Sequence, residues 1–123
     1  MTDNEVDFSI LVGSSVPVRA FKQGETIFRE GDPATELYVI KSGRVEISTG
    51  NRLLATLGDH GIFGEMALID KTPRSATVTA ATDVELVPVN EKQFLFLVSQ
   101  TPFFALKVMR VLAGRLRIAN KAI

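Results

Sequence analysis

Glycines recur at short, regular intervals through the first half of this chain. They separate short runs in which apolar residues alternate with polar ones or follow one another. The glycines that separate these runs are Gly24, Gly31, Gly43, Gly50, Gly58 and Gly61. Short runs bounded by turn residues are typical of a β-sandwich or β-roll. Because no long helical pattern fits before Asn90, the chain is predicted to be mainly β up to that residue.

The runs predict seven strands and a buried core. The expected strands are Val18–Phe21, Thr26–Arg29, Leu37–Lys41, Arg44–Thr49, Leu53–Leu57, Ser75–Ala80 and Val84–Val89. Alternate side chains of a strand point to opposite faces, so one face of each strand is available for burial. Tyr38 and most of the eight phenylalanines are therefore expected in the core.

The hydrophobic period becomes helical after the last predicted strand. Asn90 and Gln93 have the spacing of a capping box, and Phe94, Leu97 and Val98 fall on one face of the helix that follows.

A second helix start lies eleven residues further on. Thr101 is expected to cap this helix, and Pro102 suits its first position, where a missing N–H costs nothing. The helix is predicted to run to about Asn120.

Length and composition favour one folded domain. The 123 residues, 46% of them hydrophobic, suffice for a single core. We expect residues 1–15 to form a lead-in, with Phe8–Val12 packed on the domain, and residues 16–123 to form the domain itself. Within that domain, residues 16–89 are assigned to the β-structure and residues 90–121 to the helices.

Several functional classes are excluded or disfavoured by composition. The absence of cysteine excludes disulfides and iron–sulfur clusters in this chain. The polar start, MTDNEVD, is unlike a signal peptide, and no stretch reaches the roughly 18 apolar residues of a membrane span. A cytoplasmic protein without membrane contact is predicted.

The segment from residue 63 to residue 80, FGEMALIDKTPRSATVTA, has the residue types of an anion site. A short helix starting at Gly64 would offer unpaired backbone N–H groups, and Arg74 and Ser75 would add side-chain donors. Glu65 does not fit a bare anion, because a carboxylate repels a phosphate. A ligand that carries both a phosphate and a sugar hydroxyl would explain both groups.

This segment resembles the phosphate-binding cassette of the cyclic-nucleotide-binding domain family. The family includes CRP/FNR-type regulators, regulatory subunits of cAMP-dependent kinase and cyclic-nucleotide-gated channels. The matching residues run from Phe63 to Leu68 and from Pro73 to Val78. The resemblance, which extends over roughly residues 17–119, implies a mainly β fold with flanking α-helices, namely a jelly-roll-like double-stranded β-helix with a short helix in the cassette.

The resemblance also implies the roles of individual residues. Glu65 would accept a bond from the ribose 2′-OH, Arg74 would pair with the cyclic phosphate, and backbone amides from Gly64 to Ala67 would assist. A salt bridge between Arg74 and Glu65 is the structural alternative. The predicted ligand-binding residues are Phe63, Gly64, Glu65, Met66, Ala67, Arg74, Ser75, Ala76 and Arg115.

Arg115 enters this set as a lid residue on the C-terminal helix. It aligns with an arginine that lies against the purine in some bacterial channel members, and a planar guanidinium stacks well on a purine. Asn120 is a second candidate for the base, and a plain surface charge is the alternative for Arg115. By favouring one position of this helix, the ligand would signal through a population shift.

The nucleotide and the partners are less sharply defined by the sequence. Ser75 is compatible with cGMP, yet serine also occurs there in bacterial cAMP receptors, so cAMP is favoured over cGMP.

The apolar surface of the last helix is broad, which favours a homodimer through that helix, with packing on its own domain as the alternative. Five basic residues and no acid follow Thr101. These are interpreted as a solvent-facing stripe rather than a nucleic-acid site.

A second family motif precedes the cassette. The run from Phe21 to Asp32 resembles the F-x-x-G-E-x-I-F-x-E-G-D opening of the β-roll, and the run from Tyr38 to Gly43 resembles its Y-x-I-x-x-G step. Glu25, Glu30 and Asp32 are interpreted as turn or surface residues rather than a metal-binding or acid–base cluster.

The competing functions are an enzyme and a transcription factor. No catalytic residue or metal site is predicted, because a cupin-like metal centre needs clustered histidines and His60 is the only histidine. Haem ligation by His60 is disfavoured for the same reason. A CRP-type regulator would need a recognition helix after residue 120, so a separate DNA-binding domain is the alternative. A stand-alone sensor acting on an effector protein is expected.

Overall fold

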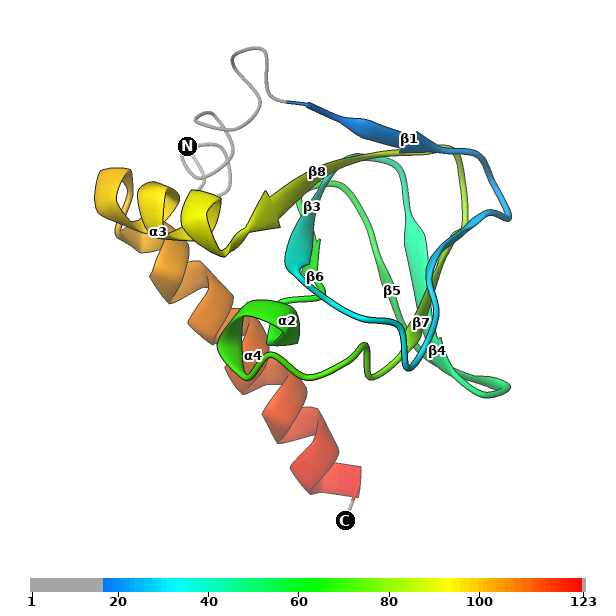
Figure 1. Ribbon diagram of the computed structural model, residues 1–123. Helices are drawn as coiled ribbons and strands as arrows, with labels where there is room; N and C mark the ends of the chain where they lie inside the picture. The colour runs from blue at the N-terminus through cyan, green and yellow to red at the C-terminus, as the bar shows by residue number, and fades with distance from the viewer. Residues whose placement is uncertain (1–16, 123) are drawn as a thin grey trace.

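Two antiparallel sheets and a set of C-terminal helices make up this fold, as predicted (Figure 1). The computed structural model describes residues 17–122, with side chains as far as Arg115. The strands are β1 Arg19–Phe21, β2 Thr26–Phe28, β3 Glu36–Ser42, β4 Val45–Thr49, β5 Arg52–Leu57, β6 Ile62–Phe63, β7 Thr77–Ala80 and β8 Val84–Asn90. The helices are α2 Met66–Ile69, α3 Glu91–Gln100 and α4 Phe103–Ala122.

Each sheet has four strands, and long connections bring distant segments together. One sheet has the order β1-β8-β3-β6 and the other has the order β2-β7-β4-β5. Strand β3 pairs with β8 along most of its length, and its short pairing with β6 places Tyr38 opposite Phe63. The cassette therefore starts at the edge of the first sheet and returns, as β7, to the centre of the second.

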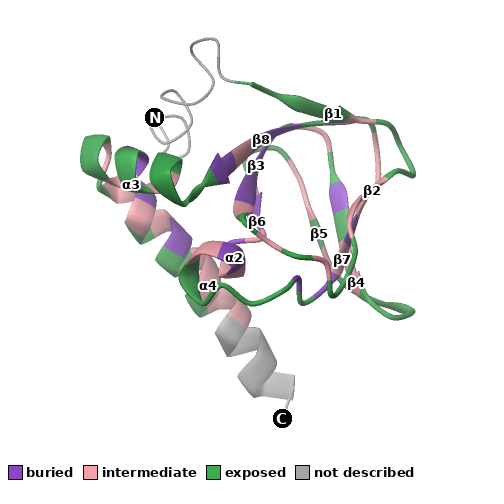
Figure 2. Ribbon diagram, viewed as in Figure 1, coloured by how far each residue is buried: buried purple, intermediate pink, exposed green. Residues whose placement is uncertain are grey.

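Two apolar clusters fill the core. One lies where the sheets face each other and includes Ile40, Val45, Phe63 and Leu86. The other joins the far side of β3 and β8 to the helices through Leu97, Phe104 and Val108. Buried segments in Figure 2 accordingly follow β3, β8 and one side of α3 and α4.

The predicted strands agree with the structure to within two residues at their ends. Two differences concern the cassette. Strand β6, only two residues long, was not predicted, because so short a run carries no period. Strand β7 begins at Thr77 rather than Ser75, because the Arg74 backbone just before it bonds to the turn after β2. In that turn, Gly31 N donates to Arg74 O at 2.8 Å, and Asp32 O accepts a bond of 2.9 Å from Arg74 N.

The predicted start of α3 is confirmed in detail. Gln93 N donates to Asn90 Oδ1 at 2.9 Å and Asn90 N donates to Gln93 Oε1 at 2.8 Å, which forms the capping box. Leu97 is buried, and Phe94 and Val98 pack partly against the same cluster, as expected.

As far as Arg115, helix α4 is buried on one side. Phe104 and Val108 are in the core, whereas Leu106 and Met109 are 42% and 59% exposed. Its first residue is Phe103, one position after the predicted Pro102, and Phe104 N donates to Thr101 O at 2.9 Å.

Among the residues described, no single helix is long and apolar enough to cross a membrane. Only α3 and Phe103–Arg115, bent by 117°, meet that test as a pair.

Two predictions lie outside this description. The lead-in of residues 1–15, with its packed segment Phe8–Val12, precedes the described residues, and the side chain of Asn120 follows them.

Candidate functional site

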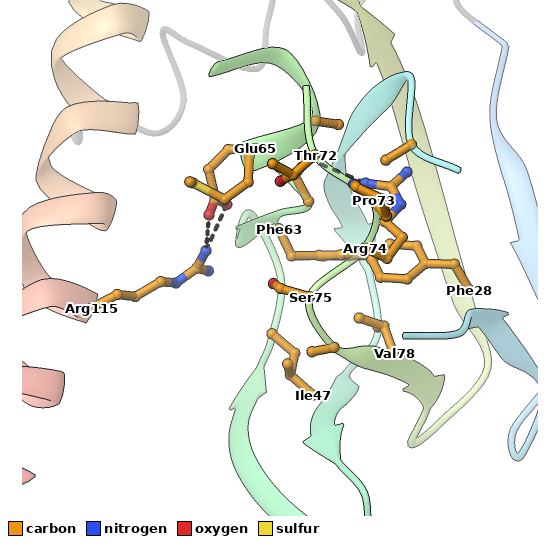
Figure 3. A pocket seen from close by; sticks show the side chains of 15 residues that line it. Phe28, Ile47, Phe63, Glu65, Thr72, Pro73, Arg74, Ser75, Val78 and Arg115 are labelled. Atoms are coloured by element: carbon orange, nitrogen blue, oxygen red, sulfur yellow. Dashed lines mark hydrogen bonds and ion pairs between the residues drawn. The ribbon is translucent and has the colours of Figure 1, made fainter. Parts of the chain in front are cut away.

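All nine residues of the predicted site line one cavity of about 80 Å³. It is enclosed by the end of β6, helix α2, the loop that leads to β7, and the side chain of Arg115 from α4 (Figure 3). Phe28, Ala34, Ile47, Thr72, Pro73 and Val78 complete the lining and were not predicted. Whether these residues bind a ligand stays a prediction, but the structure brings them together.

Gly64 permits the chain to pass close to Arg74. Its φ of +78° lies in the left-handed region that glycine adopts readily. A Cβ added at Gly64 would lie 2.8 Å from Arg74 Nη1, which is closer than real Cβ atoms approach other groups. The Gly64 carbonyl also accepts a bond of 3.3 Å from that same Nη1. A side chain at this position would therefore disturb both the turn and the arginine.

Helix α2 has four residues and begins at Met66, with Glu65 as its N-cap residue. The Glu65 carboxylate caps no backbone N–H of this helix. Ala67 N already donates to Gly64 O at 3.2 Å. Of the amides predicted to meet an anion, the one at Ala67 is thus engaged within the turn.

Glu65 is held by the C-terminal helix. Arg115 Nη1 lies 2.6 Å from both Glu65 Oε1 and Oε2, and Arg115 Nη2 donates to Ile62 O at 2.8 Å. The carboxylate is 5% exposed and the arginine side chain 35% exposed. Arg115 is consequently not a plain surface charge, because it ties α4 to both the cassette and β6.

Arg74 contrasts with Glu65 because no carboxylate pairs with it. Among the described residues, no carboxylate oxygen lies within 4.0 Å of its guanidinium, so the predicted alternative of an Arg74–Glu65 salt bridge is wrong. Its Nε is buried without a hydrogen-bond partner. Burial lowers the pKa of the Arg74 guanidinium from its usual value, and nearby Tyr38 and Glu36 oppose that shift.

An aromatic ring lies against the Arg74 guanidinium instead. The central carbon Cζ is 4.0 Å from the centroid of the Phe28 ring and 5.6 Å from that of Tyr38. Figure 3 shows Arg74 beside the Phe28 ring. Sequence reasoning treated Phe28 as a core residue of the opening motif. Its place next to the cassette depends on the pairing of β2 with β7, which no local pattern reveals.

A polar network supports the aromatic side of the site. Tyr38 donates its hydroxyl proton to Glu36 Oε1 at 2.8 Å, and Arg19 contacts both groups. Burial and the Glu36 carboxylate together raise the pKa of the Tyr38 hydroxyl above its usual value. Tyr38 therefore stays a neutral donor in this network.

Ser75 lies at the exposed end of the cavity. The loop before it is shaped by Asp70 Oδ1, which accepts bonds from Thr72 N at 3.2 Å and Thr72 Oγ1 at 2.7 Å. Lys71 adopts a φ of +57° there. Ser75 itself is exposed and lines the cavity.

Metal binding finds no support in the described part of the chain. No group of three or more histidine or acidic side chains is placed to hold an ion there. His60 is exposed in the turn between β5 and β6 with a φ of +70°.

The β-roll encloses a buried acid and a buried arginine, and Arg115 of α4 closes the cavity that they line. The family model described as the cyclic nucleotide-binding domain matches residues 18–101. The chain therefore belongs to the cyclic-nucleotide-binding domain family, as the sequence resemblance indicated.

Three similar proteins illustrate this relationship. The cyclic AMP receptor protein of Thermus thermophilus is 35% identical over 98% of this chain and 56% of its own length. The crystal structure of Thermus thermophilus catabolite activator protein has a TM-score of 0.80 at 36% identity, covering 98% of this chain and 57% of that one. The cAMP-bound form of EAL enzyme Bd1971 has a TM-score of 0.63 at 41% identity, covering 85% and 30%, and a cGMP-bound form is also similar.

The chain spans about half the length of the curated relatives that it matches. The activity of those whole proteins accordingly bears on this chain only through the part that they share with it.

Proposed function

We propose that this domain binds a cyclic nucleotide, cAMP in preference to cGMP, and signals by moving its C-terminal helix. One observation carries the proposal. Glu65 and Arg74 are the only buried charged residues in the described part of the chain, at 4% and 7% exposed, and both face the same cavity. An acceptor for a hydroxyl and a donor set for an anion are the two groups that a cyclic ribose phosphate requires.

The phosphate would lie at Arg74 and Ser75, and the ribose at Glu65. Within the described part of the chain no carboxylate occupies the donors of Arg74, and a charge-assisted bond gains strength where water is excluded. Phe63, Met66 and Ala76 would form the apolar walls of this site.

The preference for cAMP is supported by a relative, and Ser75 is compatible with either nucleotide. The similar Thermus protein is named as a cyclic AMP receptor. Bd1971, by contrast, has both a cAMP-bound and a cGMP-bound form. The preference is therefore expected to be modest, on the order of tenfold in affinity, or about 1.4 kcal/mol.

Helix signalling would act through Arg115. The cavity of about 80 Å³ is small beside ligand pockets, which usually measure roughly 300–1,000 Å³, so a nucleotide needs a wall to move. Arg115 is the lining residue contributed by α4, and it holds the carboxylate that the ribose would use. We infer that the incoming hydroxyl competes for Glu65 and that Arg115 turns toward the base, which shifts α4.

The functional unit and its assembly form part of the same proposal. Residues 16–123 would be the binding domain and residues 1–15 a lead-in. A second copy would cover the apolar side of α4, where Leu106 and Met109 are exposed. An effector protein would read the position of α4.

Calorimetric titration with cAMP and cGMP tests the binding proposal. The wild-type protein should bind both nucleotides, cAMP more tightly, and Arg74→Ala should bind neither at the same concentrations. Absence of heat with both nucleotides in the wild-type protein would overturn the proposed function. Unchanged affinity in Arg74→Ala would overturn the role of that residue alone.

Light scattering tests the assembly. The wild-type protein should have the mass of a dimer, and Met109→Glu should shift it toward the monomer because a charge would enter an apolar interface. Glu46→Lys, an exposed change on β4, is the matched control. A monomer in the wild-type protein at every concentration would contradict the dimer.

A further inference from the structure

We propose that Phe28 is a positioning residue for Arg74. The Phe28 ring would hold the Arg74 guanidinium in place without occupying the N–H donors that a ligand would use. This inference rests on the proposed function, because it assigns the donors of Arg74 to an anionic ligand. It adds a residue outside the cassette to the site.

The geometry of the pair is the first observation. Cζ of Arg74 is 4.0 Å from the Phe28 ring centroid, well inside the roughly 6 Å over which a cation is attracted to an aromatic face. Phe28 also lines the cavity. The attraction is stronger when water is excluded, and Arg74 is only 7% exposed.

The second observation concerns the group that offsets the buried charge of Arg74. A buried guanidinium is unfavourable unless something offsets its charge. A carboxylate would do so by occupying the N–H donors along the edge of the group, and no carboxylate pairs with Arg74 among the described residues. A ring offsets the charge through the face of the group and so occupies none of the edge donors. Of these donors, Nη1 bonds to Gly64 O at 3.3 Å, and Nε has no hydrogen-bond partner.

The ring is itself held in a fixed place. Phe28, Tyr38 and Phe63 form a cluster in which the ring centroids are 5.3–6.1 Å apart. The turn after β2 also bonds to the Arg74 backbone at both its N–H and its carbonyl. One segment thus fixes Arg74 by its main chain and by its side chain.

Nuclear magnetic resonance of the ligand-free protein tests the stacking without any nucleotide. A proton above a ring face is shielded, so the Arg74 Nε–H signal should lie upfield of an ordinary arginine. It should return to the ordinary position in Phe28→Leu and stay upfield in Phe28→Tyr, with Arg74→Lys to assign it. An ordinary position in the wild-type protein would overturn the inference.

Nucleotide affinity tests the consequence. Phe28→Leu should weaken cAMP binding by about 5- to 30-fold, and Phe28→Tyr should stay within about threefold of the wild-type protein. Phe21→Leu is the matched control, because Phe21 packs against the same core cluster and lies away from the cavity. It should lower stability without changing affinity by more than about twofold.

The outcomes separate the two proposals. Equal loss of affinity in Phe28→Leu and Phe21→Leu, or no loss in Phe28→Leu, would overturn the positioning role. If the wild-type protein bound neither nucleotide, the proposed function would fail, while the shielded Nε–H would still support the stacking and an unshielded one would overturn it.

Discussion

The two charged ends of the cavity are built in opposite ways. At one end, Arg74 rests on the Phe28 ring with its Nε unbonded and with no carboxylate beside it among the described residues. At the other, both oxygens of Glu65 lie 2.6 Å from Arg115 of α4. Both charges are buried, yet only one of them already has an ionic partner.

We propose that this difference separates recognition from response. The Arg74 end is held by the roll through its main chain and the Phe28 ring, so we expect it to contribute affinity for an anion. The Glu65 end is paired with Arg115 of α4, so a ligand that bonds to Glu65 must exchange one bond for another. A site with one fixed end and one exchangeable end can convert binding into helix movement.

Removing the charge of Arg74 should have the largest effect on binding. Arg74→Met is expected to weaken cAMP binding by more than about 100-fold, because two or more charge-assisted bonds are lost. The free energy of unfolding should stay unchanged or rise by about 1–2 kcal/mol, since the buried charge has no ionic partner among the described residues. Calorimetry and chemical denaturation measure the two quantities.

Arg19→Met is the control for this change, because Arg19 contacts the Tyr38 network but does not line the cavity. A strongly destabilised Arg74→Met protein would show that the charge at this end is paired after all.

Changing Glu65 should have the next largest effect and the opposite effect on stability. Glu65→Gln is expected to lower the free energy of unfolding by about 1–3 kcal/mol, because Arg115 loses its ionic partner. The wild-type protein should bind 2′-deoxy-cAMP about tenfold more weakly than cAMP, whereas Glu65→Gln should discriminate less than about threefold.

Glu36→Gln, which alters a carboxylate outside the cavity, should keep the full discrimination. If Glu65→Gln also kept it, the ribose would not lie at Glu65.

Filling the space at Gly64 should disturb the fixed end more modestly. Gly64→Ala is expected to weaken cAMP binding about fivefold, because the new Cβ would displace the Arg74 Nη1 atom, and to destabilise the fold by about 1–3 kcal/mol. Gly50→Ala is the control. Gly50 has a similar φ of +60°, and no atom lies within 4 Å of an added Cβ, so this variant tests the backbone strain without a steric clash. Equal affinities in the two variants would exclude the steric effect on Arg74.

Arg115→Ala should change affinity least. Without its guanidinium, Arg115 would no longer compete with the ribose for Glu65, which strengthens binding. The proposed contact of Arg115 with the base would also be lost, which weakens binding, so the net change in affinity is expected to stay within about threefold. The movement of α4 on ligand binding should nevertheless disappear, which hydrogen exchange of α4 amides with and without cAMP would measure. Retained movement in this variant would assign the signal to another contact.

Local residue patterns predicted the parts of the fold that depend on neighbours in sequence. The Asn90–Gln93 capping box and the face formed by Phe94, Leu97 and Val98 are of this kind. Strand β6 was missed because two residues show no alternation. The predicted start of β7 was two residues too early, because the Arg74 backbone bonds to the turn near Asp32 instead of joining the strand.

The site was predicted as a set of residues but not as a set of contacts. Family resemblance brought Glu65, Arg74 and Arg115 together, and all three line the cavity. The pairing of Glu65 with Arg115 joins residues fifty positions apart, and the ring of Phe28 reaches Arg74 only through the pairing of β2 and β7. Such contacts follow from the tertiary fold, which no spacing in the sequence encodes.

The most direct test of the exchange at Glu65 is a distance between α4 and the roll measured with and without cAMP. The chain contains no cysteine, so Ala113→Cys and Thr56→Cys, both at exposed positions, permit two spin labels to be placed specifically. Pulsed electron paramagnetic resonance on labelled protein diluted with unlabelled protein reports the distance within one chain. A shift in that distance on adding cAMP is the predicted result, and an unchanged distance at saturating cAMP would contradict it.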